Sequence, residues 1–502
     1  MDVNRKKALD VLFKNKVVIL FVILCVGGTI ASKQPLTFVI PELFTRIARN
    51  SFLVLSLIIP VLAGMGLNFG IVIGAMAAQV AIFLTTYWGF VGIGGFLLTV
   101  AIATPIAMFF GFLVGKLFNH MKGAEMIGGL VLSYFAEGLY QLLFLFIFGG
   151  VIPLYNPTLM IATGVGVKNT IDLKDTVKYA LDTVPMLTII EIGFYICVAG
   201  IIATIIIKKT KNLEINWKAA IIKLILAAAV YGVTYVPAVE QFLATDRLLL
   251  LNAIELGCAG TFIWQIWKFL ASKFIYKKDF NSKRAAVNCV LAAAVYGLTY
   301  IPAVFKVLIV VHLPVMTYLC IAGLCFFNTA LMRTRLGQNM RTVGQSRTVA
   351  NAAGINVDKT RIIAMIFSTV LASWGQLIFL QNVGTFSTYG AHTQVGQFAI
   401  AALLVGGASV QKASNKQAIL GIILFHTLFI VAPLAGKELF GDPVIGEYFR
   451  VFVSYGVIAM ALAMHAWKKI MKPSAAPPPP AGALSGSGGN PGPGAEIGRA
   501  HV

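Results

Sequence analysis

Apolar runs of about 20 residues recur along most of the chain, and this pattern restricts the possible fold more than any other feature. They lie near residues 17–32, 51–66, 69–89, 92–116, 127–150, 185–207, 219–240, 247–272, 285–304, 306–331, 362–383, 394–408, 417–434 and 446–467. Each run is long enough to cross roughly 30 Å of hydrocarbon. Because backbone that meets lipid must satisfy its own hydrogen bonds, the runs predict an all-α, polytopic transmembrane bundle of about 12–14 spans.

The composition excludes a soluble domain. Of 502 residues, 58% are hydrophobic and only 12% are charged, whereas a globular protein is about half apolar and a quarter charged. The net charge of +21 does not indicate nucleic-acid binding, because the basic residues lie in short loops between apolar runs. The expected surroundings of the apolar runs are therefore membrane lipid.

The basic loops also predict an orientation. Basic residues in 1–16 place the N-terminus in the cytoplasm, and each later basic cluster follows an even number of crossings. The segments assigned outside, 151–184, 384–393 and 435–445, are charge-balanced, uncharged or acidic. Both termini of the transmembrane region 17–472 are thus expected in the cytoplasm. The same parity argues against cleavage of the first run as a signal peptide.

Residues that carry enzyme or metal chemistry are scattered. The six cysteines lie in apolar stretches without a CxxC pair, and the histidines form no metal-ligand pair or Ser-His-Asp arrangement. Gly111 to Lys116 superficially resembles a phosphate loop, but its spacing is too short and Leu117 replaces the Ser/Thr. We therefore expect a transport subunit without a metal or cofactor of its own.

One internal duplication is plain within 219–304. The sequence from Leu226 to Val239 recurs from Leu291 to Val304, about 65 residues later. This period corresponds to one helical hairpin, which crosses and returns, so a copy does not invert the helices that follow. Pro237 and Pro302 predict a kink or a helix stop in each copy.

The last segment, 473–502, is rich in proline, glycine and serine and is expected to be a disordered tail. Residues 496–502 read like the translation of a sequencing adapter, and we regard them as an artefact by hypothesis. Resequencing the 3′ end of the gene tests this idea.

The loop 332–361 is the least apolar part of the transmembrane region, and the charge pattern places it in the cytoplasm. Ser346 is a suitable N-cap, Arg347 to Ala353 predicts a two-turn helix, and Gly354 suits the position after its end. A short surface helix of this kind fits docking to a soluble partner. A solvated loop is the plainer alternative.

The same loop carries a family resemblance. Arg333-Thr-Arg-Leu-Gly, Arg341-Thr-Val-Gly344, Ala352-Ala-Gly-Ile-Asn-Val357 and Lys359-Thr-Arg361 resemble the cytoplasmic loop of permeases that serve ATP-binding-cassette (ABC) importers of branched-chain amino acids, simple sugars and nucleosides. The segments 64–79 and 400–409 resemble the glycine-rich segments of that family. The resemblance covers about residues 50–150 and 320–470.

The resemblance implies a function and a set of partners. It implies a cytoplasmic coupling helix, discontinuous transmembrane helices, ABC ATPase subunits that bind ATP, a second permease, an extracytoplasmic solute-binding protein and a place in the bacterial cytoplasmic membrane. The ATPase-coupling residues implied are Arg341, Gly344, Gln345, Arg347, Ala353 and Gly354. Gln345, Ser346 and Arg347 depart from the family, which usually has an acidic residue and a proline there.

Uncharged hydrogen-bonding residues and one carboxylate are the candidates for the solute pathway: Asn68, Gln79, Glu137, Gln381 and Ser409. The four uncharged side chains suit a neutral polar solute, although bonding between helices is an alternative for each. Glu137 stands out because a carboxylate in hydrocarbon is costly unless it is paired. Gly64, Gly66, Gly70 and Gly74 predict close helix approach or a broken helix.

The leading interpretation is the permease subunit of an ABC importer for a small polar solute. An ion-coupled secondary transporter is the first alternative, favoured if Glu137 or Glu255 is essential for transport. An intramembrane enzyme is the second, with Asp172, Asp175 and Asp182 in loop 151–184 as its only candidate cluster; a solvated loop explains them more simply. The sequence does not name the solute or say whether the second permease is identical.

Overall fold

The computed structural model describes residues 16–121, 123–161, 165–210, 217–271 and 282–471. It divides at Ala461 into a large unit and a second unit of which only residues 462–471, the end of one helix, are described. The expected N-terminal segment 1–16, apart from Lys16, and the tail 473–502 lie outside the described residues.

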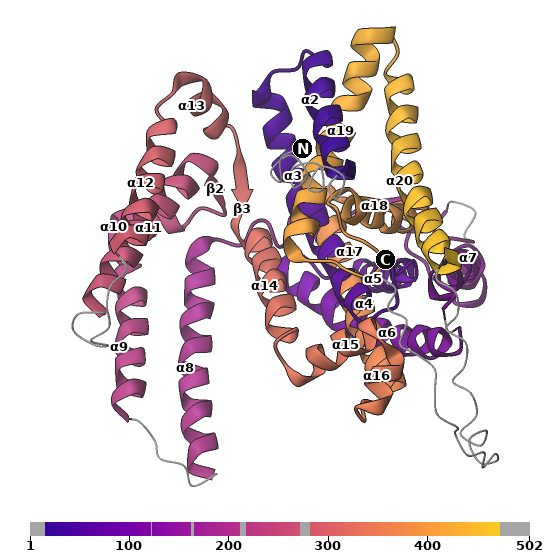
Figure 1. Cartoon of the computed structure of the whole chain (residues 1–502), viewed down its shortest axis with the longest axis horizontal. Coiled ribbons are helices and arrows are strands. Elements are labelled where there is room, and N and C mark those ends of the chain that lie inside the picture. The colour runs from indigo at the N-terminus through magenta and orange to yellow at the C-terminus, as the bar shows by residue number, and fades with distance from the viewer. Residues whose placement is uncertain (1–15, 122, 162–164, 211–216, 272–281, 472–502) are drawn as a thin grey trace, which may run out of the picture. The chain divides into compact units, whose positions relative to one another are not determined.

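The described chain is almost entirely helical, as predicted for an all-α membrane protein (Figure 1). The helices are α2 (Lys16–Ala31), α3 (Leu36–Ser56), α4 (Ile58–Leu62), α5 (Ile71–Tyr87), α6 (Gly92–His120), α7 (Glu125–Leu142), the π-helical η1 (Leu143–Val151), α8 (Met186–Thr210), α9 (Trp217–Val233), α10 (Pro237–Leu243), α11 (Leu250–Ala271), α12 (Ser282–Leu298), α13 (Pro302–Leu308), α14 (Val315–Leu331), α15 (Arg335–Gln345), α16 (Arg347–Ala352), α17 (Val357–Val383), α18 (Ala391–Val405), α19 (Asn415–Phe440) and α20 (Pro443–Met471). Strand β1 (Thr170–Asp172) pairs with β4 (Thr385–Ser387), and β2 (Arg247–Leu249) pairs with β3 (His312–Pro314), both antiparallel.

Six segments of the described chain are long and apolar enough to cross a membrane: Leu36–Leu62, Gly92–His120, Glu125–Val151, Met186–Thr210, Val357–Val383 and Asn415–Phe440. Two bent helix pairs, α12 with α13 and α14 with α15, raise the number to 8. The number is below the expected 12–14 partly because runs such as 69–89 and 394–408 fold into helices of 17 and 15 residues. The chain is a multi-pass membrane protein with interrupted helices.

Helix α17 is the centre of the large unit and packs against α3, α5 and α6. Small residues permit the close approach. A Cβ on Gly111 or Gly115 of α6 would lie 2.9 Å from the Cα of Ile366 or Ile362 on α17. A Cβ on Gly74 of α5 would lie still closer, 2.5 Å from the Thr369 carbonyl oxygen. Helix α17 is buried along one side near its start and on nearly all sides from Leu371 to Asn382.

The span that contains α3 begins earlier than the apolar run 51–66 suggested. Polar residues interrupt the hydropathy between Thr45 and Asn50, but the helix continues through them. Arg46 pairs with Glu42 at 2.9 Å, and the Arg49 Nε donates to the Asn382 Oδ1 at 2.9 Å. Because these cations have partners, they are tolerated inside the span.

The duplicated region is a structural repeat. The second copy reproduces a long helix, a short helix that starts at proline, and a strand: α9, α10 and β2 correspond to α12, α13 and β3. Pro237 and Pro302 each occupy the first turn of the short helix, and the second copy bends by 88° there. The predicted helix stop is confirmed. The two copies are joined by the β2–β3 pair, with Leu248 opposite Leu313.

Candidate functional site

The loop that joins α14 to α17 contains two helices where one was predicted. Helix α16 runs from Arg347 to Ala352, one residue shorter than expected, and the Ser346 Oγ accepts from the Val349 N at 3.3 Å. Gly354 has φ +75°, which the left-handed end of a helix requires. The predicted cap, helix and terminating glycine are confirmed.

The longer helix α15 was missed by the sequence reasoning. Thr334 caps it by accepting from the Gly337 N at 3.2 Å, and Met340 and Val343 are buried three residues apart on one face. This cap and spacing are the local signals that could have revealed it.

Gly344 of α15 packs against the glycine-rich turn between α4 and α5. A Cβ at Gly344 would collide with the Leu62 carbonyl oxygen, and a Cβ at Gly64 would lie 2.6 Å from the Gly344 Cα. Gly64 and Gly66 also have φ of +74° and +75°, so this segment is a broken helix, as the sequence suggested. The loop and the glycine-rich segment are therefore in direct backbone contact.

One carboxylate joins α7, α16 and α17. Glu125 is the first residue of α7, and its Oε1 accepts from the Arg361 Nη2 at 2.7 Å and from the guanidinium of Arg347. Arg361 is 1% exposed and also donates to the Phe118 carbonyl at 3.3 Å. Arg347 is the outer, partly exposed member of the group. Arg347, which departs from the residues that the family usually has at this point, thus forms an ion pair within the chain.

The other predicted coupling residues are on the surface of the described chain. Arg341, Gln345, Ala353 and Gly354 are exposed, and Val349 of α16 is an exposed apolar side chain. The loop is consequently fixed to the bundle by Gly344 and Arg347, among other contacts, and presents these four predicted coupling residues outward.

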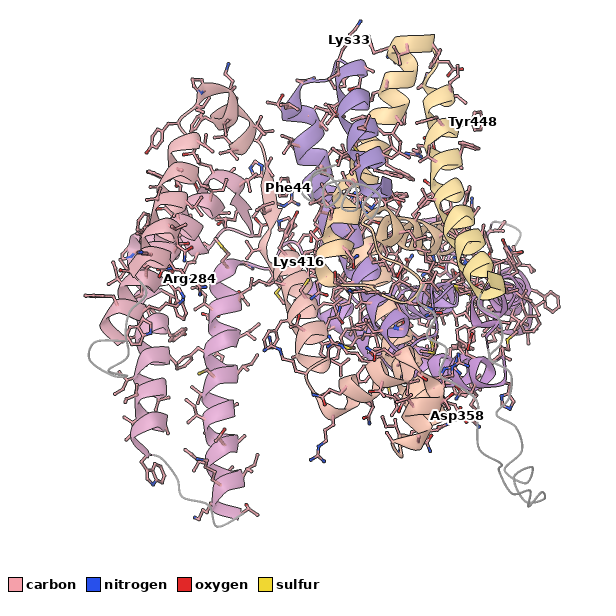
Figure 2. The ribbon with its side chains drawn as sticks, viewed as in Figure 1. Lys33, Phe44, Arg284, Asp358, Lys416 and Tyr448 are labelled. Carbon is pink, nitrogen blue, oxygen red and sulfur yellow. The ribbon has the colours of Figure 1, made fainter. Side chains whose placement is uncertain are left out.

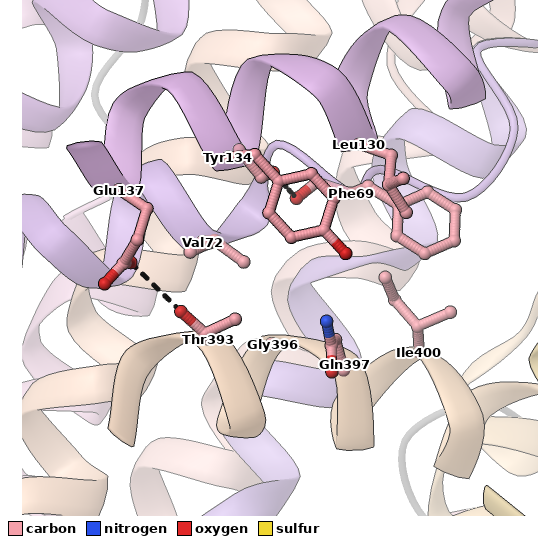
Figure 3. A pocket seen from close by; sticks show the side chains of 10 residues that line it. Phe69, Val72, Leu130, Tyr134, Glu137, Thr393, Gly396, Gln397 and Ile400 are labelled. Atoms are coloured by element: carbon pink, nitrogen blue, oxygen red, sulfur yellow. Dashed lines mark hydrogen bonds between the residues drawn. The ribbon is translucent and has the colours of Figure 1, made fainter. Parts of the chain in front are cut away.

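A hollow lies where the two glycine-rich segments meet α7 (Figure 3). The hollow is small and is lined by Phe69, Val72, Leu130, Ser133, Tyr134, Glu137, Thr393, Gly396, Gln397 and Ile400. Phe69 and Val72 belong to segment 64–79, and Ile400 begins segment 400–409. The two segments that resemble the family and the predicted pathway residue Glu137 therefore meet at this hollow.

Glu137 projects from α7 toward α18 (Figure 3). Its Oε2 accepts from the His392 Nε2 at 2.5 Å and from the Thr393 hydroxyl at 3.1 Å, and its Oε1 accepts from the Gln141 Nε2 at 3.0 Å. These donors supply the pairing that a carboxylate within a span requires. His392 is fully buried and was missed because no other ligand-type residue lies near it in sequence.

The surface of the hollow is apolar, although several of the residues that line it carry polar groups. Glu137 is one of the lining residues, and its carboxylate oxygens are engaged by His392, Thr393 and Gln141. Thr393 and Gln397 add a hydroxyl and an amide from successive turns of α18, while Phe69 and Tyr134 supply aromatic rings. If these polar groups turned into the hollow, they would hydrogen-bond a polar solute while the rings covered its apolar parts.

Three predicted pathway amides are buried at separate places. The Asn68 Nδ2 donates to the Ser368 Oγ at 3.2 Å, the Gln79 Nε2 is 3.5 Å from the Ser387 carbonyl, and the Gln381 Nε2 donates to the Asp182 Oδ1 at 3.0 Å. Each amide oxygen is without a partner among the described residues. Ser409 is exposed in a turn, where its Oγ accepts from the Lys412 N at 3.1 Å. The structure does not bring the five candidates together.

Segment 165–186 is more ordered than the solvated loop that we expected. Asp172 and Asp175 are exposed, in agreement with that expectation, but Asp182 is only 1% exposed. The expectation is wrong for Asp182 because it lies against the end of α17 rather than in solvent. Tyr389, just before α18, donates to the Val167 carbonyl at 2.8 Å. Its partial burial raises the pKa of the phenol.

The fold and site define a multi-pass helical membrane protein with a capped surface helix and a small hollow between its helices. The chain is 28% identical over 187 residues to the xylose transport system permease protein XylH of Haemophilus influenzae, covering 37% of this chain and 45% of that protein. It is 29% identical over 175 residues to the nucleoside ABC transporter permease protein NupC of Lactococcus lactis subsp. cremoris, covering 34% and 52%.

These matches support the assignment to the sugar and nucleoside ABC permease family that the loop resembled. The chain spans about half the length of the curated relatives it matches. No family model and no solved structure matches the chain.

Proposed function

We propose that this chain is the permease subunit of an ABC importer that moves a small polar solute, such as a simple sugar or a nucleoside, into the bacterial cytoplasm. The observation that carries the proposal is the 332–361 loop, in which α16 is exposed for docking while Gly344 and Arg347 fix the loop to the bundle. The similarity to xylose and nucleoside permeases supports it.

In this proposal the exposed face of α16 binds a separate ABC ATPase, with both termini and the loop in the cytoplasm. Closure of two ATPase subunits on ATP displaces α16. The ion pairs of Glu125 then transmit the displacement to α7, and the Gly344–Gly64 contact transmits it to the α4–α5 turn. Helix α7 and the α4–α5 turn both contribute residues that line the hollow.

The partners follow from the same proposal. A second permease, identical or homologous, completes the transmembrane pathway, and an extracytoplasmic solute-binding protein delivers the solute. ATP binds the partner ATPase, and this chain uses no cofactor.

The first test replaces residues 347–354 by a Gly/Ser linker of equal length. We expect purification in mild detergent from the native membrane to recover ATPase activity with the intact chain and to lose nearly all of it with the linker variant. The reason is that the linker removes the exposed helix and the Arg347 contact together. The measurement is ATP hydrolysis per mole of purified permease.

A Gly/Ser replacement at residues 155–158, an exposed turn in a segment assigned to the exterior, is the matched control and should retain the ATPase. Recovery of equal ATPase activity with the 347–354 variant would show that α16 is not the docking element. An ATPase-free wild-type preparation would reject the importer itself.

The Glu137→Gln variant tests the hollow. We expect solute uptake to fall about tenfold, because the substitution removes a charged acceptor and sets an amide NH₂ against the donors from His392 and Thr393. The measurement is initial uptake of labelled D-xylose and uridine by cells expressing the complete system. Glu438→Gln, which changes a carboxylate that pairs with Lys33, should leave uptake unchanged. Equal uptake by the Glu137 variant and the control would remove Glu137 from the pathway.

An ion-coupled secondary transporter is a second candidate because of one observation. The pair formed by Glu137, in a candidate span, and His392, at the start of α18, is of the type found in proton relays. That candidate predicts uptake that collapses when the ion gradient is abolished while ATP is kept constant. The importer predicts uptake that follows ATP.

A further inference from the structure

Asp182 is a buried carboxylate for which the proposed coupling path has no use. It is 1% exposed and lies four residues before α8 begins. Three side chains donate to it: the Thr317 hydroxyl at 2.5 Å and the Gln381 Nε2 at 3.0 Å to Oδ1, and the Asn382 Nδ2 at 2.7 Å to Oδ2.

The three donors come from two helices. Thr317 lies near the start of α14, whereas Gln381 and Asn382 lie at the end of α17. A fourth residue, Arg49 of α3, donates to the other side of the Asn382 amide at 2.9 Å. The cation and the carboxylate therefore fix the orientation of that amide between them.

Backbone contacts fix the segment that carries Asp182 in the same place. The Tyr179 N donates to the Gln381 carbonyl at 2.9 Å, and the Leu173 N donates to the Gly384 carbonyl at 3.0 Å. Strand β1 pairs with β4 immediately beyond α17. Thr317 is thus the side-chain donor that adds α14 to an otherwise continuous attachment on α17.

The place of α14 and α17 in the chain links the Asp182–Thr317 hydrogen bond to the coupling loop. These two helices are the flanks of the 332–361 loop, which joins the end of α14 to the start of α17. Asp182 connects the same two helices at their opposite ends. A displacement of the loop that moves α14 relative to α17 must therefore act on the Asp182–Thr317 bond.

We propose that Asp182 is a positioning residue that latches segment 173–183 to α14 and α17 at the ends remote from the coupling loop, and that the latch opens when the loop is displaced. The inference rests on the proposed function for the source of that displacement. The partner that operates it is the ATPase, and the region it controls is the side of the bundle assigned to the exterior.

The chemistry suits a latch that opens and closes. Two of the three donors belong to α17 and would retain Asp182 when α14 moves away. A hydrogen bond to a charged group is stronger than a neutral one, but only one such bond must break. The latch is consequently strong in the resting state without requiring the carboxylate to become unpaired.

The test uses the full chain, copurified with its ATPase and reconstituted in lipid vesicles. Val177→Cys places a thiol on a residue of the segment that is only 1% exposed, and a membrane-impermeant maleimide reports its accessibility by mass spectrometry of the labelled peptide. Labelling rates are compared without nucleotide and with ATP plus vanadate. Thr317→Val removes the α14 donor with little change of shape, and Thr317→Ser restores a hydroxyl.

We expect labelling of the parent protein to accelerate with ATP plus vanadate. Without nucleotide, the Thr317→Val variant should label about tenfold faster than the parent, because one charge-assisted bond has been removed. Thr317→Ser should label like the parent. Asp182→Asn should also label fast, and Asp175→Asn, an exposed carboxylate of the same segment, should not.

Two controls separate a latch from general destabilisation. All variants should melt within about 3 °C of the parent in detergent, and a cysteine at Tyr155, which is 89% exposed, should label equally in all of them. Equal labelling of Val177→Cys in the Thr317→Val and parent backgrounds would overturn the latch. A nucleotide response absent from the parent would count against the importer, while the comparison of Thr317→Val with the parent would still decide whether the bond restrains the segment.

Discussion

Replacing Glu125 by alanine is expected to cost roughly 3–5 kcal/mol of stability. The substitution leaves Arg361, which is 1% exposed, without the carboxylate that it contacts at 2.7 Å. An unpaired cation at a buried position carries a large desolvation penalty. The measurement is the thermal unfolding midpoint in mild detergent, together with the amount of protein in the membrane.

Arg347→Gln is the matched control for this prediction. Its side chain is 33% exposed, so its loss leaves the Glu125–Arg361 pair in place and should cost no more than about 1 kcal/mol. A Glu125→Ala protein as stable as Arg347→Gln would show that Arg361 does not depend on this carboxylate.

Gly421→Val is expected to cost roughly 3 kcal/mol, with a matching loss of folded protein. Gly421 and Gly406 lie where α19 crosses the end of α18. A Cβ at Gly421 would collide with the Ala402 carbonyl oxygen, and one at Gly406 with the Gln417 carbonyl oxygen. Backbone atoms meet on both sides, so no side chain can rotate to make room. Thermal melting in detergent measures the effect.

Gly193→Val on α8 serves as the comparison, because a Cβ there meets no atom within 4 Å. It should melt within about 3 °C of the wild type. Equal melting of the Gly421 and Gly193 variants would contradict the close crossing of α18 and α19.

Local signals in the sequence were sufficient for several features of the site. Ser346, the short helix after it and Gly354 form a cap, a helix and a stop within nine residues, so their physics is contained in a short window. The same holds for Pro237 and Pro302, which start a short helix in each repeat. Glu137 stood out because hydrocarbon leaves a carboxylate few alternatives.

Features that depend on distant contacts could not be predicted in the same way. Arg361 follows Glu125 by 236 residues, and Gln381 follows Asp182 by 199. Neither pairing leaves a local pattern. Asp182 was assigned to solvent because lysines and other aspartates surround it in sequence, and only the tertiary fold shows that it is buried. Likewise, Arg46 and Arg49 lower the hydropathy of the first half of α3, so the apolar run alone did not show where this helix begins.

Helix α7 carries Glu125 at its first residue and Glu137 in the wall of the hollow, about 18 Å further along its axis. Because both residues belong to one helix, a shift of α7 at Glu125 also moves Glu137. In the proposed importer, a change of ATPase partner that shifts the tether also reshapes the hollow, and a change of solute that shifts the hollow also strains the tether. The ATPase partner and the solute specificity are then expected to change together during evolution. Chimeras that exchange one without the other should need compensating substitutions in α7.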